Sequence, residues 1–556
     1  MYQKRYQIMA VICAFSLSAA ACGSTPELSS AANAAAKETE NTSDVSDLFS
    51  DRDLSGSYDA AACERILLSD AGCTADSKNV TIDKSVVTIT GEGDYILNGA
   101  LSDGRIVVDV DKSEKVQLVL NGVDLTSKTS AAIYVKQADK VFITLADGTE
   151  NTLANGGAFE AVDDNNIDAV IFSKDDLTLN GTGKLTVNSP AGHGIVSKND
   201  LVVTNGTYEI TAASHGMTGK DSVAVADGTF CITAGKAAVK SVNDDDLTKG
   251  NVSVTGGMFT LSAGTDGINA MNEIHISGGR IGIEESNEGL EARVINLSGG
   301  EIEITAKDDG LNATDKRTDT NTDGEVKADL RHTDANEADA TDTFRGGHGG
   351  MGQSHPEASI YMSGGVIRID AEGDGVDSNG YFAMSGGELY VAGPSNGGNG
   401  ALDYDIEASI SGGIVVAAGQ SGMVQNFGEG STQGAILVNT SAQNAAGSDI
   451  ILLDSEGKEL VAWTMQKSYN SVVISAPEIK AGSSYTVKTG DISTAVTMEG
   501  LIYGEGGGFG GGQGFRKGER PGFQKGERPE GMPEHPEGER PEGMPEPPEF
   551  QEGKHL

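Results

Sequence analysis

The sequence is poor in basic and aromatic residues. It has 40 Lys and Arg against 82 Asp and Glu, a formal net charge of −42, and 5% aromatic residues with a single Trp. So acidic a chain is repelled by nucleic acids and by anionic membrane surfaces, which excludes both as direct partners. A polyanionic ligand could bind only with a cation between the two. The shortage of aromatics also argues against the flat row of Trp or Tyr on which many cellulose-binding modules stack their ligand.

Cysteine patterns and common catalytic motifs are also missing. None of the five cysteines lies in a CxxC or Cys/His pattern that would predict zinc, and no P-loop, Rossmann or G-x-S-x-G motif is present. In an exported protein Cys63 and Cys73, ten residues apart, could form a local disulfide or remain free thiols. Cys231, in GTFCITA, is predicted to be a small buried residue.

The two ends of the chain predict export and disorder. Lys4 and Arg5 precede IMAVICAFSLSAAA, an apolar stretch too short to span a bilayer, so residues 1–22 are predicted to be a signal peptide. The stretch ends in AAAC, which resembles a bacterial lipoprotein box with Cys22 as the lipidated residue; simple cleavage is the alternative. Residues 23–79 are expected to be a tether and N-terminal cap, and residues 503–556, rich in Gly, Pro and Glu, a disordered tail. We therefore expect a monomer anchored by lipid to the extracellular face of a bacterial membrane.

Between these ends a Gly-containing dipeptide recurs between short β-rich runs, mostly at steps of 21–22 residues. The runs alternate in polarity and have no helical period, which predicts strands joined by tight turns. Strands with a constant coil length and no crossover helix favour a right-handed parallel β-helix over residues 80–430, with about 22 residues per coil, and a small β cap over 431–502. An antiparallel sandwich is the alternative. The second residues of the dipeptides are Gly181, Gly206, Gly228, Gly257, Gly279, Gly300, Gly365, Gly387 and Gly413.

A second repeated step, acid–Gly–aliphatic–acid or amide, has the same period. Residues one coil apart stack about 4.8 Å from each other, so the positions before and after this glycine form two ladders. Stacked carboxylates repel unless a cation lies between them or one is protonated, and oxygen ligands suit calcium. Solvated turns are the alternative. The first ladder comprises His193, His215, Ala237, Asp266, Glu288, Asp309, Asp374 and Asn399, and the second Asn269, Glu291, Asn312 and Asp377. The predicted calcium ligands are Asp266, Asn269, Glu288, Glu291, Asp308, Asp309, Asn312, Asp374 and Asp377.

An acidic insertion, residues 315–359, separates two of the coils. It contains Asp319-x-Asn321-x-Asp323-Gly324, the first half of an EF-hand-type loop, but Leu330 occupies the place of the bidentate Glu. This pattern favours a mobile acidic loop over a complete calcium loop.

Several of these stretches together resemble a family of bacterial surface carbohydrate-binding β-helix proteins, whose clostridial members are similar in fold to pectate lyases. They are YILNGALSDGRIVVDVDKSEKVQLVLNGVDLTS (95–127), the SGG turns, DDGLNA, GDGVDSNG and KSYNSVVISAPEIKAGSSYTV. The resemblance covers about residues 80–500. It implies a right-handed parallel β-helix that holds calcium and binds plant polysaccharides such as cellulose and pectin without catalysis. It also implies that Asp266, Asp309 and Asp374 occupy calcium positions, whereas Glu288 departs from the family's aspartate.

The expected function is polysaccharide binding, including uronate-containing chains, by a lipid-anchored, non-catalytic protein. Two alternatives remain open. A calcium-dependent polysaccharide lyase would need a base near the acids, for which Lys307, Arg293 and Lys316 are candidates. A structural adhesin rod would need no ligand site. Candidate ligand-binding residues are Tyr361, Tyr381, Tyr390 and Tyr404, each of which could instead belong to a strand core, while Trp463 is expected to be buried in the cap.

Overall fold

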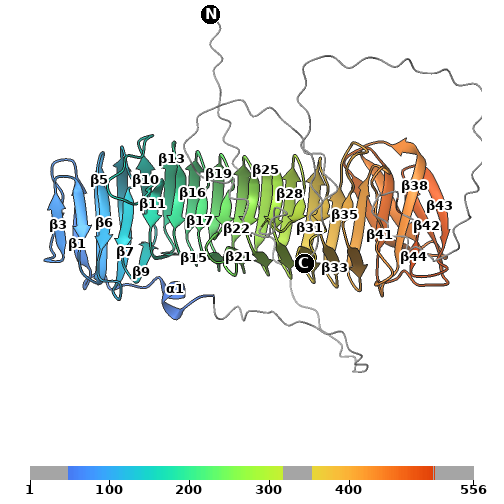
Figure 1. The fold of residues 1–556 in the computed structure, drawn as a ribbon, viewed down its shortest axis with the longest axis horizontal. Coiled ribbons are helices and arrows are strands. Elements are labelled where there is room, and N and C mark those ends of the chain that lie inside the picture. The colour runs from blue at the N-terminus through green and yellow to red at the C-terminus, as the bar shows by residue number, and fades with distance from the viewer. Residues whose placement is uncertain (1–47, 317–353, 505, 507–556) are drawn as a thin grey trace, which may run out of the picture. The chain divides into compact units, whose positions relative to one another are not determined.

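The computed structural model describes residues 48–316, 354–504 and 506. The signal peptide with Cys22, most of the acidic insertion with its Asp319–Gly324 motif, and the C-terminal tail lie outside the described residues. The described part is almost entirely β, and it forms a parallel β-solenoid of about 12 turns, which confirms the predicted fold class (Figure 1). Its one helix, α1 (Asp51–Ser55), has five residues, and no helix among the described residues is long and apolar enough to cross a membrane.

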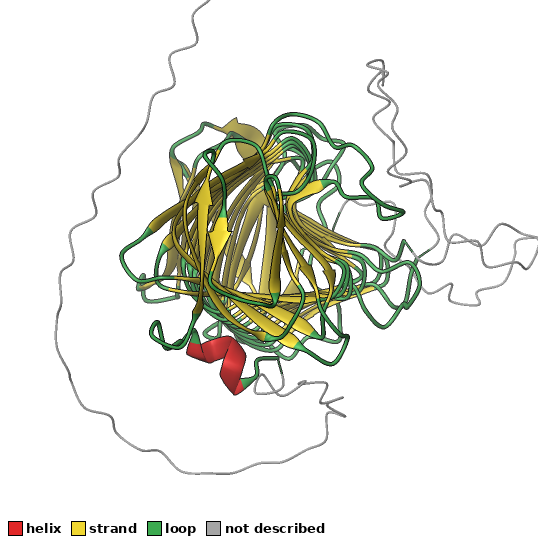
Figure 2. Ribbon diagram, turned by 90° about the vertical axis from the view of Figure 1, so that its left-hand side faces the viewer, coloured by secondary structure: helices red, strands yellow, loops and turns green. Residues whose placement is uncertain are grey.

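Each regular coil contributes one strand to each of three faces, which enclose the core (Figure 2). The first face contains β9 (Lys140–Leu145), β12 (Asp176–Gly181), β15 (Asp200–Val203), β18 (Ser222–Val225), β21 (Asn251–Val254), β24 (Glu273–Ile276), β27 (Val294–Leu297), β30 (Ser359–Met362), β33 (Tyr381–Met384) and β36 (Glu407–Ile410). The second face contains β10 (Glu150–Asn155), β13 (Lys184–Ser189), β16 (Thr207–Ala212), β19 (Thr229–Ala234), β22 (Met258–Ala263), β25 (Arg280–Ser286), β28 (Glu301–Ala306), β31 (Val366–Ala371), β34 (Glu388–Ala392) and β37 (Ile414–Gly419).

The third face is a separate 13-stranded sheet. Its strands are β3 (Val80–Asp83), β4 (Val86–Ile89), β6 (Arg105–Asp109), β8 (Ile133–Gln137), β11 (Ala169–Ser173), β14 (His193–Ser197), β17 (Met217–Gly219), β20 (Val239–Ser241), β23 (Asp266–Ala270), β26 (Glu288–Ala292), β29 (Leu311–Ala313), β32 (Val376–Ser378) and β35 (Leu402–Tyr404). The first and second faces belong to one sheet because β5 (Gly93–Leu101) and β7 (Lys115–Ser127) run across both.

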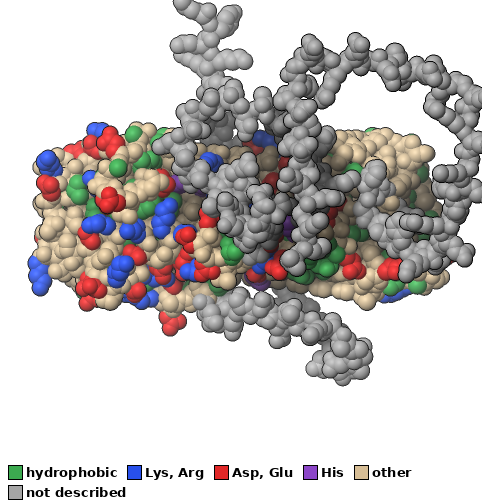
Figure 3. Space-filling model, in the orientation of Figure 1, with side chains coloured by type: hydrophobic (Ala, Val, Ile, Leu, Met, Phe, Trp, Pro, Cys, Tyr) green, Lys and Arg blue, Asp and Glu red, His purple; other side chains and the backbone are tan. Residues whose placement is uncertain are grey.

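Strand alternation places the core inside the coils. On β24, for example, Ile274 and Ile276 are fully buried whereas His275 points outward. Identical types stack from coil to coil: the rings of Phe230 and Phe259 lie 4.4 Å apart and nearly parallel. Charged side chains of both signs are interspersed on the outside of the N-terminal coils (Figure 3).

The corner between the first and second faces requires glycine. All nine glycines of the recurring dipeptide have positive φ, from 82° at Gly365 to 135° at Gly228. This confirms that the dipeptide marks a tight turn in each of these coils. At Gly279, where φ is 88°, a Cβ atom would also lie 2.9 Å from the carbonyl oxygen of Gly257 in the preceding coil. Only a residue without a side chain fits both the dihedral angle and the close approach.

Replacing Gly279 with Ala should therefore lower the free energy of unfolding by about 2 kcal/mol or more. Gly282→Ala, three residues further on in the same coil, is the matched control. Its φ is not positive and the nearest atom to its Cβ would be Phe259 O at 3.6 Å, so its effect should stay within about 1 kcal/mol. Chemical denaturation measures both, and equal losses would contradict the turn requirement.

The two ends of the stack are closed by further strands, most of which pair antiparallel. At the N-terminal end β1 (Glu64–Ser69) pairs with β2 (Thr74–Ala75), and β3 pairs with β4. At the C-terminal end β41 (Tyr469–Ser475) pairs with β37 and with β38 (Ala435–Asn444), and β44 (Ile502–Tyr503) adds to β38. A four-stranded sheet lies beyond, formed by β39 (Ser448–Leu453), β40 (Glu459–Met465), β42 (Ser484–Thr489) and β43 (Ile492–Thr497). These strands cover edges that would otherwise expose unpaired backbone groups.

The structure answers the open question of the disulfide and corrects the predicted burial of Cys231. Cys63 and Cys73 are free thiols. The prediction that Cys231 is buried is wrong, because β19 alternates and directs Phe230 and Ile232 inward, which leaves Cys231 exposed on the second face.

Candidate metal centre

The strand register of the third face brings the predicted polar ladders together. Asp266 pairs with Glu288, Asn269 with Glu291, Glu291 with Asn312, and Asn312 with Asp377. The second ladder is therefore confirmed as a continuous column of β23, β26, β29 and β32.

The glycine of the acid–Gly step, here called the anchor, allows neighbouring coils to pack closely on this face. A Cβ atom on Gly267 would lie 2.8 Å from Gly289 O of the next coil and 2.4 Å from Cδ1 of Ile283 in the core. The backbone of each coil thus passes directly against the next at this corner. The acidic side chains on either side of the glycines consequently repeat at the coil spacing, about 4.8 Å.

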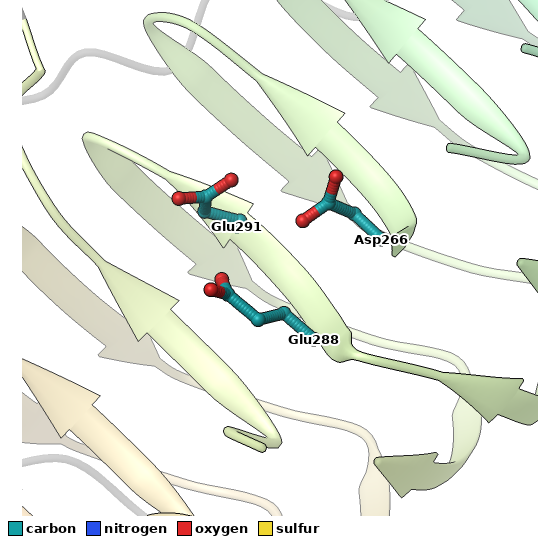
Figure 4. A group of neighbouring side chains, drawn as sticks. All are labelled: Asp266, Glu288 and Glu291. Atoms are coloured by element: carbon teal, nitrogen blue, oxygen red, sulfur yellow. The ribbon is translucent and has the colours of Figure 1, made fainter. Parts of the chain in front are cut away.

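Three carboxylates converge on one point of this corner. Asp266, Glu288 and Glu291 each have a carboxylate oxygen within 4.8 Å of the other two, and Figure 4 shows their carboxyl groups directed toward one another from β23 and β26. Glu291 is only 4% exposed, and the other two are partly buried. Burial, followed by the charge of Glu291, raises the pKa of Asp266 to about 6 and that of Glu288 to about 9. Without a cation, the cluster therefore retains a proton near neutral pH.

Amide groups and one lysine surround the carboxylates. Asn269 Nδ2 donates to Glu291 Oε2 at 2.5 Å, Asn312 Nδ2 donates to Glu288 Oε2 at 3.1 Å, and Lys316 pairs with Glu291 Oε1. The Oδ1 atom of Asn312 is buried and has no hydrogen-bond partner among the described residues. A buried acceptor without a donor is costly unless something else satisfies it.

This donor set fits a calcium ion. Asp266, Glu288 and Glu291 offer carboxylate oxygens, Asn312 Oδ1 offers a buried amide oxygen, and calcium accepts six to eight oxygen ligands in flexible geometry. A bound cation would replace the retained proton and satisfy the orphaned acceptor. The set has no sulfur or imidazole ligand that would favour zinc.

The downstream acids are arranged differently. Asp309 Oδ1 accepts the backbone N–H of Asp374 at 2.7 Å, and Asp374 Oδ1 accepts that of Gly400. Burial, the largest cause in each case, raises the pKa of Asp309 to about 7, that of Asp374 to about 8 and that of Asp377 to about 9. Among the described residues these carboxylates do not form a three-acid cluster. The carboxylate oxygens of Asp309 and Asp374 instead link one coil to the next.

Two residues of the downstream ladder differ from the prediction. The stacking position after Asp374 is held by Gly400, whose carbonyl accepts from Gly375 N, so Asn399 does not belong to the ladder. The reason is a one-residue shift: Ala401, not Gly400, is the anchor of that coil. Asp403 then pairs with Asp377 and extends the second ladder, which the sequence analysis missed. Asp308 is exposed beside the column.

The basic candidates are all paired. Lys307 contacts Glu285 at 2.6 Å, and Arg293 donates to Asn272 Oδ1 at 2.7 and 3.1 Å. Desolvation opposes charge on Lys316, but the pairing with Glu291 raises the pKa of Lys316 above its ordinary value. Lys316, the one basic candidate that contacts the cluster in the described structure, therefore holds its proton.

The four candidate tyrosines lie on different faces. Tyr361 and Tyr381 point outward from β30 and β33 on the first face and are 45% and 36% exposed. Tyr390 lies on the second face, where its ring centre is 5.8 Å from that of Trp463. Tyr404 lies on the third face and donates to Asn426 O. The four cannot form one platform, but Tyr361 and Tyr381 can act together.

Comparisons with known proteins point to a carbohydrate-binding family. A family model described as "Carbohydrate-binding domain-containing protein" matches residues 83–293 and 282–400. A protein of the same description from Acetivibrio thermocellus is 42% identical over 135 residues, which are 24% of this chain and 47% of that protein, so the match spans about half the length of this curated relative. A solved structure described as the polysaccharide lyase-like protein from C. thermocellum, a gadolinium derivative, is 34% identical, with a TM-score of 0.39, over 43% of this chain and 93% of that one.

Proposed function

Because this chain belongs to the family of carbohydrate-binding domain-containing proteins, we propose that it binds acidic polysaccharide through calcium held on the third face of its β-helix, without catalysis. The single observation that supports calcium most is the convergence of Asp266, Glu288 and Glu291 beside Asn312, whose Oδ1 has no hydrogen-bond partner among the described residues. The polysaccharide would be of the plant cell-wall type and would include uronate units.

Calcium resolves the conflict between protein and ligand charge. The chain carries a formal charge of −42, so a uronate polymer is repelled unless a cation lies between the two sets of carboxylates. Calcium accepts more oxygens than the protein cluster provides, which leaves coordination positions for ligand carboxylates. Repetition of contacts along successive coils would add weak interactions along a polymer.

The surroundings of the cluster favour binding over bond cleavage. A polysaccharide lyase abstracts a proton beside the uronate carboxyl and needs an unprotonated base within reach. Lys316 touches the cluster but is held in its charged form by Glu291, while Arg293 is engaged by Asn272. Among the described residues, these two basic side chains therefore do not provide the acidic cluster with an unprotonated base.

The proposed location is the extracellular face of the membrane. The charged start, short apolar stretch and AAAC sequence support an exported precursor lipidated on Cys22. A protein held in this way, through a tether that is part of residues 23–79, would attach the cell to its polysaccharide. This role needs only binding.

The test is binding to uronate oligomers of increasing length, with calcium and with excess chelator. Affinity should rise with oligomer length and disappear in chelator, because the cation bridges protein and ligand. Affinity that is flat with length, or insensitive to chelator, contradicts the bridging. Release of unsaturated products would place the protein among the lyases, and absence of binding to any glycan would favour a structural rod.

A further inference from the structure

The first face carries an uncharged polar strip over its last six coils, from β21 to β36. One column of outward side chains follows the middle of the strands: Ser253, His275, Asn296, Tyr361, Ala383 and Ser409. A second column of hydroxyls follows the strand ends, where each backbone N–H donates to the last residue of the equivalent strand in the preceding coil: Thr255, Ser277, Ser298, Ser363, Ser385 and Ser411. In a chain with 22% charged residues, none of these twelve positions is Asp, Glu, Lys or Arg.

Apolar side chains lie exposed in the middle column and beside it on three successive coils. Tyr361 on β30 is 45% exposed, Tyr381 on β33 is 36% exposed, and Ile406, directly before β36, is 36% exposed. Large apolar groups exposed together on a sheet face indicate a contact surface. Aromatic faces beside rows of hydroxyls match a sugar ring, whose C–H face packs on the aromatic ring and whose rim forms hydrogen bonds.

The upstream part of the same face already holds another segment of the chain, the short helix α1 and the residues that follow it. The middle column begins with Gln117, Phe142 and Thr178, and the segment around α1 crosses these positions. Gln117 Nε2 donates to Ser57 O at 3.2 Å, Thr178 Oγ1 donates to Asp53 Oδ1 at 2.5 Å, and the guanidinium of Arg52 lies 4.4 Å from the ring centre of Phe142. Outward side chains of this face therefore already bind another segment of the chain by polar and aromatic contacts.

We propose that the strip from β21 to β36 is a second ligand surface, which binds a neutral polysaccharide along the stack without calcium. The inference rests on the proposed function for the class of ligand but uses a different face from the acidic cluster. Coils repeat at about 4.8 Å, close to the length of one β-1,4-linked hexose, so a straight chain meets equivalent side chains coil after coil. An acidic chain finds no cation on the strip and meets Glu273 and Glu407 beside it, which selects a neutral one.

The test uses the full chain with microcrystalline cellulose and cello-oligosaccharides of increasing length, in excess chelator. The wild type should bind, with affinity rising up to about six sugars, the number of coils in the strip. Tyr361→Ala/Tyr381→Ala should weaken binding about tenfold or more, since exposed anchor aromatics carry much of the energy of such contacts. Ser363→Glu/Ser385→Glu should do the same without removing an apolar side chain. Met258→Ala, which removes a 52% exposed side chain from the second face, should change nothing.

Failure of this inference is distinguishable from failure of the calcium site. If the wild type binds uronate oligomers in calcium but not the neutral polymer in chelator, the strip is overturned and the acidic cluster stands. If it binds only the neutral polymer, the strip stands alone. Wild-type affinity for cellulose in both double variants overturns the strip, and thermal melting of each variant confirms that it is folded.

Discussion

Near neutral pH, calcium should stabilise the wild-type protein by about 3 kcal/mol at a concentration one hundred times its dissociation constant, and Glu288→Gln should lose most of this gain. An ion bound only by the native state stabilises it by mass action. Glu288 contributes one of the three converging carboxylates, and an amide in its place supplies one neutral oxygen without the negative charge.

The same substitution should have little effect in chelator. With its pKa raised to about 9 by burial and by Glu291, Glu288 keeps its proton near neutral pH when no cation is present. Glutamine is a neutral group of the same shape whose oxygen can still accept from Asn312 Nδ2, so the free energy of unfolding should change by less than about 1 kcal/mol.

The control is Glu301→Gln on the second face, where the carboxylate pairs with Arg280 at 3.0 Å on the surface. A surface pair is worth at most about 1 kcal/mol, and its loss should be the same with calcium and with chelator. Urea denaturation of the three proteins under both conditions gives the comparison. If Glu288→Gln lowered stability equally in both, Glu288 would be a structural residue and the cluster no calcium site.

The fold was predictable because its strongest constraint is periodic. Gly279 and its equivalents must be glycine, since both the positive φ and the contact with the preceding coil exclude a side chain. The positive φ recurs at the same corner in nine successive coils and fixes their length from the sequence. The register of the acidic ladder followed from it, except where Ala401 replaced the anchor glycine and displaced the count by one residue. This shift concealed Asp403.

For the candidate metal centre, the sequence predicted which residues stack in columns but not which of them converge. Sequence spacing places Asp266, Asp309 and Asp374 in equivalent positions, yet only Asp266 joins a three-carboxylate cluster in the described residues, whereas Asp309 and Asp374 accept backbone N–H groups. The difference depends on side-chain directions. Glu288, the departure from the aspartate pattern, has the longer side chain that reaches Glu291. The four tyrosines lie in neighbouring coils, on β30 and β33–β35, but the period does not reveal which of the three faces each one occupies.

In chelator, the stability of the wild-type protein should fall as the pH rises from about 5 to about 9. Carboxyls in an unfolded chain titrate near pH 4. Burial holds the folded pKa of Asp266 at about 6, of Asp309 at about 7, of Asp374 at about 8, and of Glu288 and Asp377 at about 9. Between these limits the folded state binds more protons than the unfolded state, so the free energy of unfolding decreases with pH. This contribution is fully present below the unfolded pKa and is lost as the pH passes the folded values.

Calcium should reverse most of this pH dependence at the cluster, because the ion binds the ionised carboxylates and makes their deprotonation favourable. Denaturation curves at about pH 5, 7 and 9 should therefore separate progressively between chelator and calcium, by about 3 kcal/mol or more at the highest pH. Asp377→Asn should flatten the upper part of the chelator profile, since it removes a group whose folded pKa is about 9. Profiles that coincide with and without calcium, or a stability that rises across this range in chelator, would mean that the acidic columns are solvated and ionised without a cation.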